Sequence, residues 1–275
     1  MTLIDTHCHL DFDAFDGVRD EVVQRALDAG VTRIINPGTD LARSRAALGL
    51  ADTYPGVYAA VGIHPNSTAD FSSALLDEVR ALAAHPKVIA IGEIGLDYHW
   101  DDSPPATQRR ALEAQLMLAA DLGLPVIIHN REAGDDVLDV LAEWVATLPE
   151  SLRARPGVLH SFSAPPEIAE RGLALGFYLG FTGSVTFKNA DALRQIAARV
   201  PADRILIETD APFLTPHPYR GRRPNEPAYV RFIAERLAAL RVESDGDFAA
   251  QTTANAERLF SLPPAKSVSA TDEHG

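Results

Sequence analysis

Histidine and acidic side chains recur in this sequence directly after short apolar segments. The first example is LIDTHCHLDF, residues 3–12, which places His7 and His9 two positions apart. Successive side chains of a β-strand alternate between its two faces, so both imidazoles would point the same way. Two imidazoles on one face can bind a single metal ion, and the stretch is therefore a candidate metal site.

Polar groups end most of the later apolar segments as well. Alone, each has an ordinary structural interpretation, such as a hydrogen-bonded core histidine or a carboxylate that caps the next segment. Gathered at one place, buried carboxylates would be costly without a compensating cation. The residues at these segment ends are His7, His9, His64, Glu93, His129, His160, Glu208 and Asp210.

The residue types indicate which cations would fit. Imidazoles combined with carboxylates suit Zn²⁺, Mn²⁺, Fe²⁺ or Co²⁺ better than Ca²⁺, which prefers oxygen ligands. Four histidines with two carboxylates exceed what one tetrahedral ion needs. We therefore expect two divalent ions with Glu93 between them, an arrangement that can hold both oxygens of an in-line displacement.

The elements that would position these residues alternate along the chain. Several apolar segments are continuous and rich in Val and Ile, as in parallel strands buried on both faces. The expected strands are 3–7, 33–36, 57–63, 88–93, 126–129, 158–160, 177–181 and 205–210. The expected helices are 19–30, 73–84, 104–123, 135–147, 166–175 and 190–198, with two more after the last strand.

Eight strands, nearly all followed by a helix, predict a (β/α)₈ TIM barrel. A doubly wound open sheet is the alternative, but no GxGxxG or Walker loop follows the first strand. In a parallel barrel the chemistry lies at the carboxyl ends of the strands. The barrel would thus gather the polar segment ends at one place.

Composition limits the class of protein. The 275 residues, 46% hydrophobic and 23% charged, suit one globular domain, expected over 1–262 and followed by a polar tail at 263–275. A single cysteine excludes intramolecular disulfides, and the absence of a long apolar segment predicts a cytoplasmic protein with no membrane contact. A net charge of −13 argues against broad electrostatic coating of nucleic acid, although a bound metal could still attract it locally.

With these residues assembled, the sequence resembles the TatD family of metal-dependent deoxyribonucleases, which are amidohydrolase-like barrels. The resemblance extends from residue 3 to about residue 260. The motifs that carry it, in chain order, are DTHCHL, GIHP at 62–65, GEIGLDY at 92–98, PVIIHNRE at 125–132, HSFS at 160–163, TGSVTFK at 182–188, ETDAPFL at 208–214 and NEPAYV at 225–230.

The resemblance implies a ligand set and a reaction. Family members act on DNA phosphodiester bonds with Mg²⁺ or another divalent ion, some as 3′→5′ exonucleases on single strands. It implies Mg²⁺, Mn²⁺ or Zn²⁺ as cofactor and single-stranded DNA or 3′ ends as substrate. No obligate protein partner is inferred. His64 would contact substrate. The metal ligands it implies are His7, His9, Glu93, His129, His160 and Asp210.

Two segments depart from the family pattern. APPE at 164–167 replaces the small residues usual after the HSFS-type motif, and YRGRRPNEP contains Pro224 as an extra residue. Both lie on loops that would follow the sixth and eighth strands, where substrate would rest. They bear on substrate preference more than on the metal site.

A mechanism follows as a hypothesis. Asp210 would bind metal and accept a proton from the attacking water, with Glu93 and His64 as the other catalytic groups. Glu208 would orient a ligand or substrate, or serve a structural role. Phosphate would contact His64, Arg131 and the arginines of the RGRR segment, namely Arg220, Arg222 and Arg223. Tyr98, Trp100 and Phe213 would stack on a base or pack internally.

Two other functions remain open at this level. The same barrel and metals could hydrolyse amide, lactone or aminoacyl-ester bonds, as an aminoacyl-tRNA deacylase would. That chemistry predicts an apolar cleft, whereas phosphodiester chemistry predicts basic groups near the metals. A non-catalytic metal-binding protein would have lost a ligand or the base, and none is missing.

Overall fold

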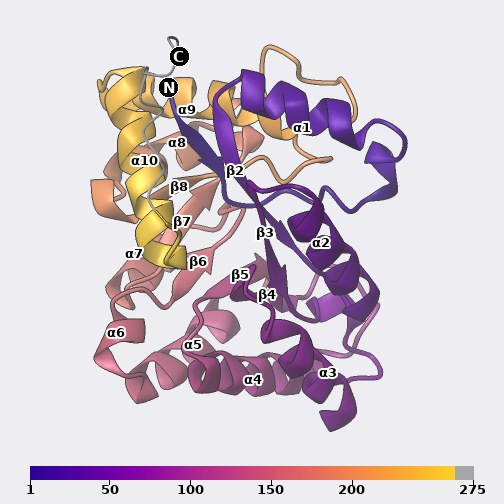
Figure 1. The fold of residues 1–275 in the computed structure, drawn as a ribbon. Coiled ribbons are helices and arrows are strands. Elements are labelled where there is room, and N and C mark those ends of the chain that lie inside the picture. Colours follow the sequence, from indigo (N-terminus) through magenta and orange to yellow (C-terminus); the bar gives the residue numbers. More distant parts are fainter. Residues whose placement is uncertain (264–275) are drawn as a thin grey trace.

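The predicted barrel is confirmed. In a computed structural model that describes residues 1–263, eight parallel strands are hydrogen-bonded in sequence order, and helices surround them (Figure 1). The strands are β1 Leu3–Asp5, β2 Val31–Pro37, β3 Val57–Val61, β4 Val88–Asp97, β5 Val126–Arg131, β6 Gly157–Leu159, β7 Tyr178–Phe181 and β8 Ile205–Ile207.

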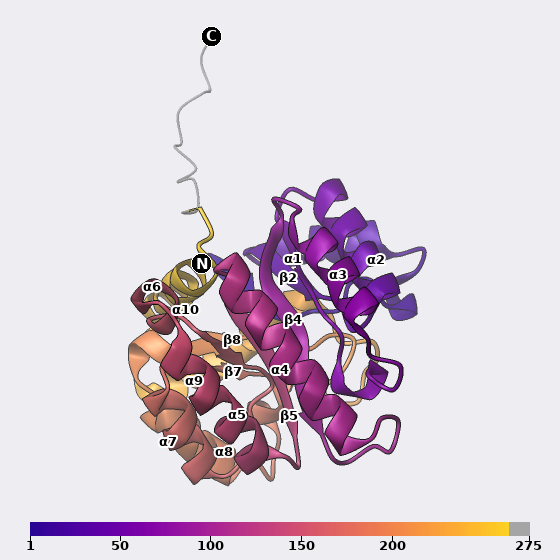
Figure 2. The same cartoon turned by 90° about the horizontal axis from the view of Figure 1, so that it is seen from below.

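Helices connect consecutive strands and cover the outside of the sheet. One of them, α4, lies along β4 (Figure 2). The helices are α1 Arg19–Asp28, α2 Leu41–Thr53, α3 Ser73–Ala83, α4 Pro105–Leu122, α5 Gly134–Thr147, α6 Glu150–Arg153, α7 Pro166–Ala174, α8 Asp191–Arg199, α9 Val230–Arg241 and α10 Asp245–Phe260.

The barrel closes between its first and last strands just beyond their ends. The backbone N–H of Thr6 donates to the Ile207 carbonyl, and Cys8 forms a parallel bridge with Ala211. In addition, the Asp210 N–H donates to the His7 carbonyl at 2.8 Å. Closure therefore ties together the two segments that carry the first and last predicted ligands.

Both faces of the strands are buried, as the continuous apolar segments predict. Alternate residues either enter the barrel interior or pack against the helices. The interior cluster consists of Ile4, Ile35, Ala60, Ile89, Ala90, Ile127, Val158, Tyr178 and Leu206, joined by Ala256, Leu259 and Phe260 of α10 and by Leu262. The last turns of α10 thus extend the interior core with apolar side chains.

The strand boundaries differ from the predicted ones where the chain approaches the site. The first and last strands end two and three residues earlier than expected, at Asp5 and Ile207, whereas β4 continues to Asp97. Asp210 adopts a positive φ of 52°, which no β-strand residue has. Tertiary closure of the barrel, rather than strand alternation, fixes the directions of these side chains.

The helix predictions missed α2. Its buried side chains are small, namely Ser44, Ala47 and Ala51, so the segment shows little apolar periodicity. The predicted ends of α4 are confirmed, with Pro105 at its first position and Gly123 as its left-handed C-cap.

Within residues 1–263, no helix combines the length and the apolar character that crossing a membrane requires. Except for Pro263, the predicted polar tail at 263–275 lies outside the described residues.

Candidate active site

The carboxyl ends of the strands surround a cavity of about 700 Å³. Its volume falls within the roughly 300–1,000 Å³ usual for ligand pockets. His7 is fully buried beside it. The predicted site residues that line the cavity are His9, His64, Glu93, His129, Arg131, His160 and Asp210.

Glu93 lies at the centre of the cluster. Its Oε1 is 2.8 Å from Nε2 of His160 and 2.9 Å from Nδ1 of His129. Its Oε2 is 3.5 Å from Nε2 of His7 and 3.8 Å from Nε2 of His9. One carboxylate therefore faces two separate pairs of imidazoles.

The HxH pair and Asp210 form one side of this arrangement. The Nε2 atoms of His7 and His9 are 3.2 Å apart. Oδ1 of Asp210 lies 3.8 Å from the first and 3.7 Å from the second. The ring of His160 stacks on that of His7 with centroids 3.8 Å apart. The imidazoles of His7 and His9 therefore converge, even though β1 ends at Asp5, before both residues.

The donor set fits divalent metal ions. Three groups each have potential ligand atoms within 4.8 Å of one another: His7, His9 and Glu93; His7, His160 and Asp210; and His64, Glu93 and His129. Glu93 and Asp210 form no ion pair with a lysine or arginine within residues 1–263. Buried carboxylates without a basic partner are otherwise costly, so a cation accounts for the grouping.

Burial determines which groups are charged. It lowers the pKa of His9 to about 3, so this imidazole is neutral and its lone pair is available to a metal. Burial raises the pKa of Asp210 to about 6. For Glu93 burial also acts upward, but the adjacent His160 and His64 and the hydrogen bonds from His129 and His160 outweigh it, and its pKa lies well below the usual value.

Two further carboxylates lie beside the histidines, and one of them, Asp97, is hydrogen-bonded to its histidine. Oδ2 of Asp97 is 3.0 Å from Nε2 of His129, and Oε1 of Glu93 is 2.9 Å from its Nδ1. Burial alone would lower the pKa of His129, but the hydrogen bonds to these two carboxylates raise it. When Nδ1 binds a metal in place of its proton, Nε2 still donates to Asp97. Oε1 of Glu208 lies 3.6 Å from Nδ1 of His160, whose Nε2 faces Glu93. Such partners fix the tautomer and the ring orientation of a metal-binding histidine.

His64 has the opposite arrangement. Its Nδ1 accepts a hydrogen bond from the Asn66 backbone N–H at 3.2 Å. In the neutral ring the proton then lies on Nε2, which is 3.7 Å from Glu93. Burial keeps the ring neutral by lowering its pKa to about 4. A donor at Nε2 suits contact with a substrate oxygen better than metal ligation.

Comparison with known proteins agrees with this geometry. The family model of the TatD related DNases matches residues 4–261. The chain belongs to this family. It is 44% identical to the uncharacterized metal-dependent hydrolase YabD of Bacillus subtilis, covering 94% of this chain and 99% of the relative. It is 38% identical to the 3′-5′ ssDNA/RNA exonuclease TatD of Escherichia coli, covering 94% and 99%.

A solved structure shows the same fold. The TatD homolog YJJV from Escherichia coli superimposes with a TM-score of 0.88 at 36% identity, covering 95% of this chain and 98% of that one. The resemblance seen in the sequence motifs is therefore confirmed.

The remaining predicted site residues of this TatD family member lie in different places. Arg131 lines the cavity, as do Trp100 and Phe213. The guanidinium of Arg220 stacks 3.5 Å from the ring centroid of Phe187, away from the cavity lining. Arg222 stacks on Tyr219 in the same loop. Tyr98 is half-buried, packs against the core and donates from its hydroxyl to Asp136, and it does not line the cavity.

Glu208 does not line the cavity. It is fully buried and accepts hydrogen bonds from the Thr6 hydroxyl at 3.2 Å and from the Ser161 backbone N–H. A Cβ at Gly180 would lie 2.5 Å from its Oε2, so the glycine makes room for this carboxylate. These contacts hold the carboxylate beneath the site, and both the orienting and the structural role predicted for it stay open.

Sequence reasoning missed Asp97. It lies in the motif GEIGLDY, four residues after Glu93 and on the same strand. Extending the period-two alternation through the motif would have placed both carboxylates on one face. The intervening Gly95 allows β5 to pass close by, because a Cβ there would lie 1.9 Å from the His129 carbonyl.

Proposed function

We propose that this protein is a divalent-metal-dependent exonuclease that hydrolyses single-stranded DNA or RNA from the 3′ end. The observation that carries the proposal is the shared carboxylate of Glu93, which faces two sets of imidazoles within one cavity. A relative of 38% identity is named a 3′-5′ ssDNA/RNA exonuclease. The cytoplasmic location stays a prediction.

We assign two divalent ions to the site, Mg²⁺, Mn²⁺ or Zn²⁺. His7, His9 and Asp210 would hold one ion, His129 and His160 would hold the other, and Glu93 would lie between them. When bound, the ions activate water and neutralise charge on the phosphate. The separation of the imidazole pairs around Glu93 supports this assignment.

The chain's own groups would then direct the proton and the substrate. Asp210 lies at the cavity wall, and its carboxylate accepts the proton of the attacking water. The Nε2–H of His64 donates to a phosphate oxygen, and Arg131, which lines the same cavity, adds a fixed positive charge. Both contacts stabilise charge that develops on the phosphate in the transition state.

The test is digestion of single-stranded DNA labelled separately at each end, with Mg²⁺, Mn²⁺ and Zn²⁺ in turn. We expect stepwise shortening from the 3′ end, abolished by chelation and by Glu93→Gln. RNA of the same sequence, assayed in parallel, shows which sugar is preferred.

Cleavage from the 5′ end, or products from internal cuts, would contradict the exonuclease direction. Absence of cleavage with all three ions would remove the nuclease proposal. It would favour hydrolysis of amide, lactone or aminoacyl-ester bonds, and aminoacyl esters would be the next substrates to assay.

A further inference from the structure

Two half-exposed aromatic side chains line the cavity from opposite sides of the barrel. Trp100 follows β4 and is 51% exposed, whereas Phe213 follows β8 and is 49% exposed. Both line the cavity that contains Glu93. Strands β4 and β8 are four positions apart in the strand order and thus face each other across a closed barrel. The metal-binding cluster therefore lies between two aromatic walls.

The Trp100 wall carries a positive charge. Cζ of Arg131 lies 5.5 Å from the centroid of the Trp100 ring. Among residues 1–263, no acidic side chain forms an ion pair with Arg131, so its charge is available to a ligand. Arg131 is two residues after His129 on β5 and points to the same side of the strand. A ring and a phosphate-binding group thus lie together beside the cluster.

The opposite wall is a series of rings that leads away from the cluster. The ring of Phe12 stacks on that of His9, with centroids 4.6 Å apart. Phe12 in turn contacts Phe213 edge to face at 6.0 Å. The outermost ring, Phe213, is the exposed one, so it is available to stack on a planar ligand.

The charged side chains beyond Trp100 differ in sign from those beyond Phe213. Beyond the Trp100 wall, a second hollow of about 490 Å³ is lined by Arg131 and by three carboxylates, those of Glu132, Asp135 and Glu167. Arg171 forms an ion pair with Asp135, and the ring of His99 contacts the carboxylate of Glu132. Glu167 has no ion-pair partner in the described part of the chain. A polyanion is disfavoured on this side.

Past Phe213, the loop that continues the chain is basic. Its exposed arginines form no ion pairs with acidic residues in the described region. A nucleic acid strand that enters the cavity would therefore run over this loop and end near Trp100. The arginines are Arg220, Arg222 and Arg223.

We propose that Trp100 and Arg131 bind the 3′-terminal nucleotide and that Phe213 stacks on the penultimate base. The assignment rests on the exonuclease function proposed above and adds the subsites on either side of the scissile phosphate. A base must leave its duplex partner to lie against either ring, so the two walls select an unpaired end. Stacking on an aromatic side chain contributes about 5- to 150-fold in binding.

The test uses one single-stranded oligonucleotide in three forms: intact, abasic at the 3′-terminal position, and abasic at the penultimate position. The measured quantity is kcat/KM for release of the first nucleotide. We expect the wild-type protein to lose about 5- to 150-fold with each abasic form.

Two variants assign the subsites. Trp100→Ala should lose the discrimination against the terminal abasic form and keep that against the penultimate one, and Phe213→Ala should do the reverse. Trp100→Phe should restore most of the discrimination. Met117→Ala is the matched control, since Met117 is 67% exposed on α4 outside the cavity lining. Unchanged discrimination in both variants, or the opposite pairing of variant and position, would overturn the proposal.

A binding measurement separates this inference from the activity. In the Trp144→Phe, Glu93→Gln protein, Trp100 is the remaining tryptophan, because the sequence contains two. Quenching of its fluorescence by the intact oligonucleotide, but not by the terminally abasic form, supports the subsite even if no cleavage is found. Absence of such quenching overturns the subsite even if the protein is an exonuclease.

Discussion

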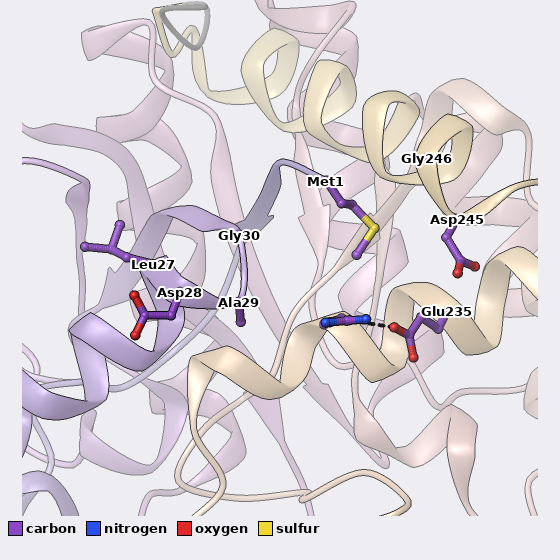
Figure 3. A pocket seen from close by; sticks show the side chains of 9 residues that line it. Met1, Leu27, Asp28, Ala29, Gly30, Glu235, Asp245 and Gly246 are labelled. Carbon is purple, nitrogen blue, oxygen red and sulfur yellow. Dashed lines mark hydrogen bonds and ion pairs between the residues drawn. The ribbon is translucent and has the colours of Figure 1, made fainter. Parts of the chain in front are cut away.

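The two ends of the barrel both carry ionisable side chains around a hollow, but they arrange them differently. At the amino ends of β1 and β2 a hollow of about 450 Å³ is lined by Met1, Asp28, Arg231, Glu235 and Asp245 (Figure 3). Its acidic groups are mostly exposed, and Nε of Arg231 donates to Glu235 at 2.6 Å. The carboxyl-end cavity instead gathers buried carboxylates and imidazoles around Glu93.

The difference shows what makes a cluster of ionisable groups chemically useful. At the amino end solvent screens the charges, and an exposed ion pair contributes little to stability. At the carboxyl end burial removes the solvent, and within residues 1–263 no lysine or arginine forms an ion pair with Glu93 or Asp210. The partners of Glu93 there are imidazoles, whose nitrogens can bind metal ions in place of protons.

Of three further substitutions, Asp210→Asn at the carboxyl end should have the largest effect. The variant keeps the size of the side chain but removes the proton acceptor, so we expect turnover to fall roughly 10²–10⁴-fold. Single-strand digestion measures the loss, and circular dichroism checks that the fold is retained. Retention of more than about a tenth of the activity would exclude Asp210 as the base.

A smaller effect is expected for Asp97→Asn. Asp97 acts through His129, and loss of such a partner typically weakens metal affinity about 10–100-fold. The midpoint of activation by Mn²⁺ should rise accordingly, while turnover at saturating Mn²⁺ changes less. An unchanged midpoint with reduced turnover would show that Asp97 contacts substrate instead.

The smallest effect is expected at the amino end. Glu235→Gln removes the carboxylate of an exposed ion pair, so activity should be unchanged and the free energy of unfolding should alter by no more than about 0.5 kcal/mol. Urea denaturation and the digestion assay measure both. A tenfold loss of activity would show that the two ends of the barrel are coupled.

Much of this arrangement was accessible from the sequence. The alternation of apolar segments and helices predicts the barrel, and a parallel barrel gathers the ends of its strands at one face. The sequence alone therefore identifies the residues at those ends. Strand formation and apolar burial depend mainly on the residues within a short segment, so the local sequence predicts both.

Tertiary structure decided the rest. The strand alternation expected for His7 and His9 does not apply, because β1 ends at Asp5 and the bridge between Cys8 and Ala211 aligns the segment instead. Packing also gives two nearby aromatic residues different environments. Trp100 is exposed in the cavity, whereas Tyr98 packs beside the core. Local sequence does not record which atoms face each other across the barrel, because that depends on how distant strands close it.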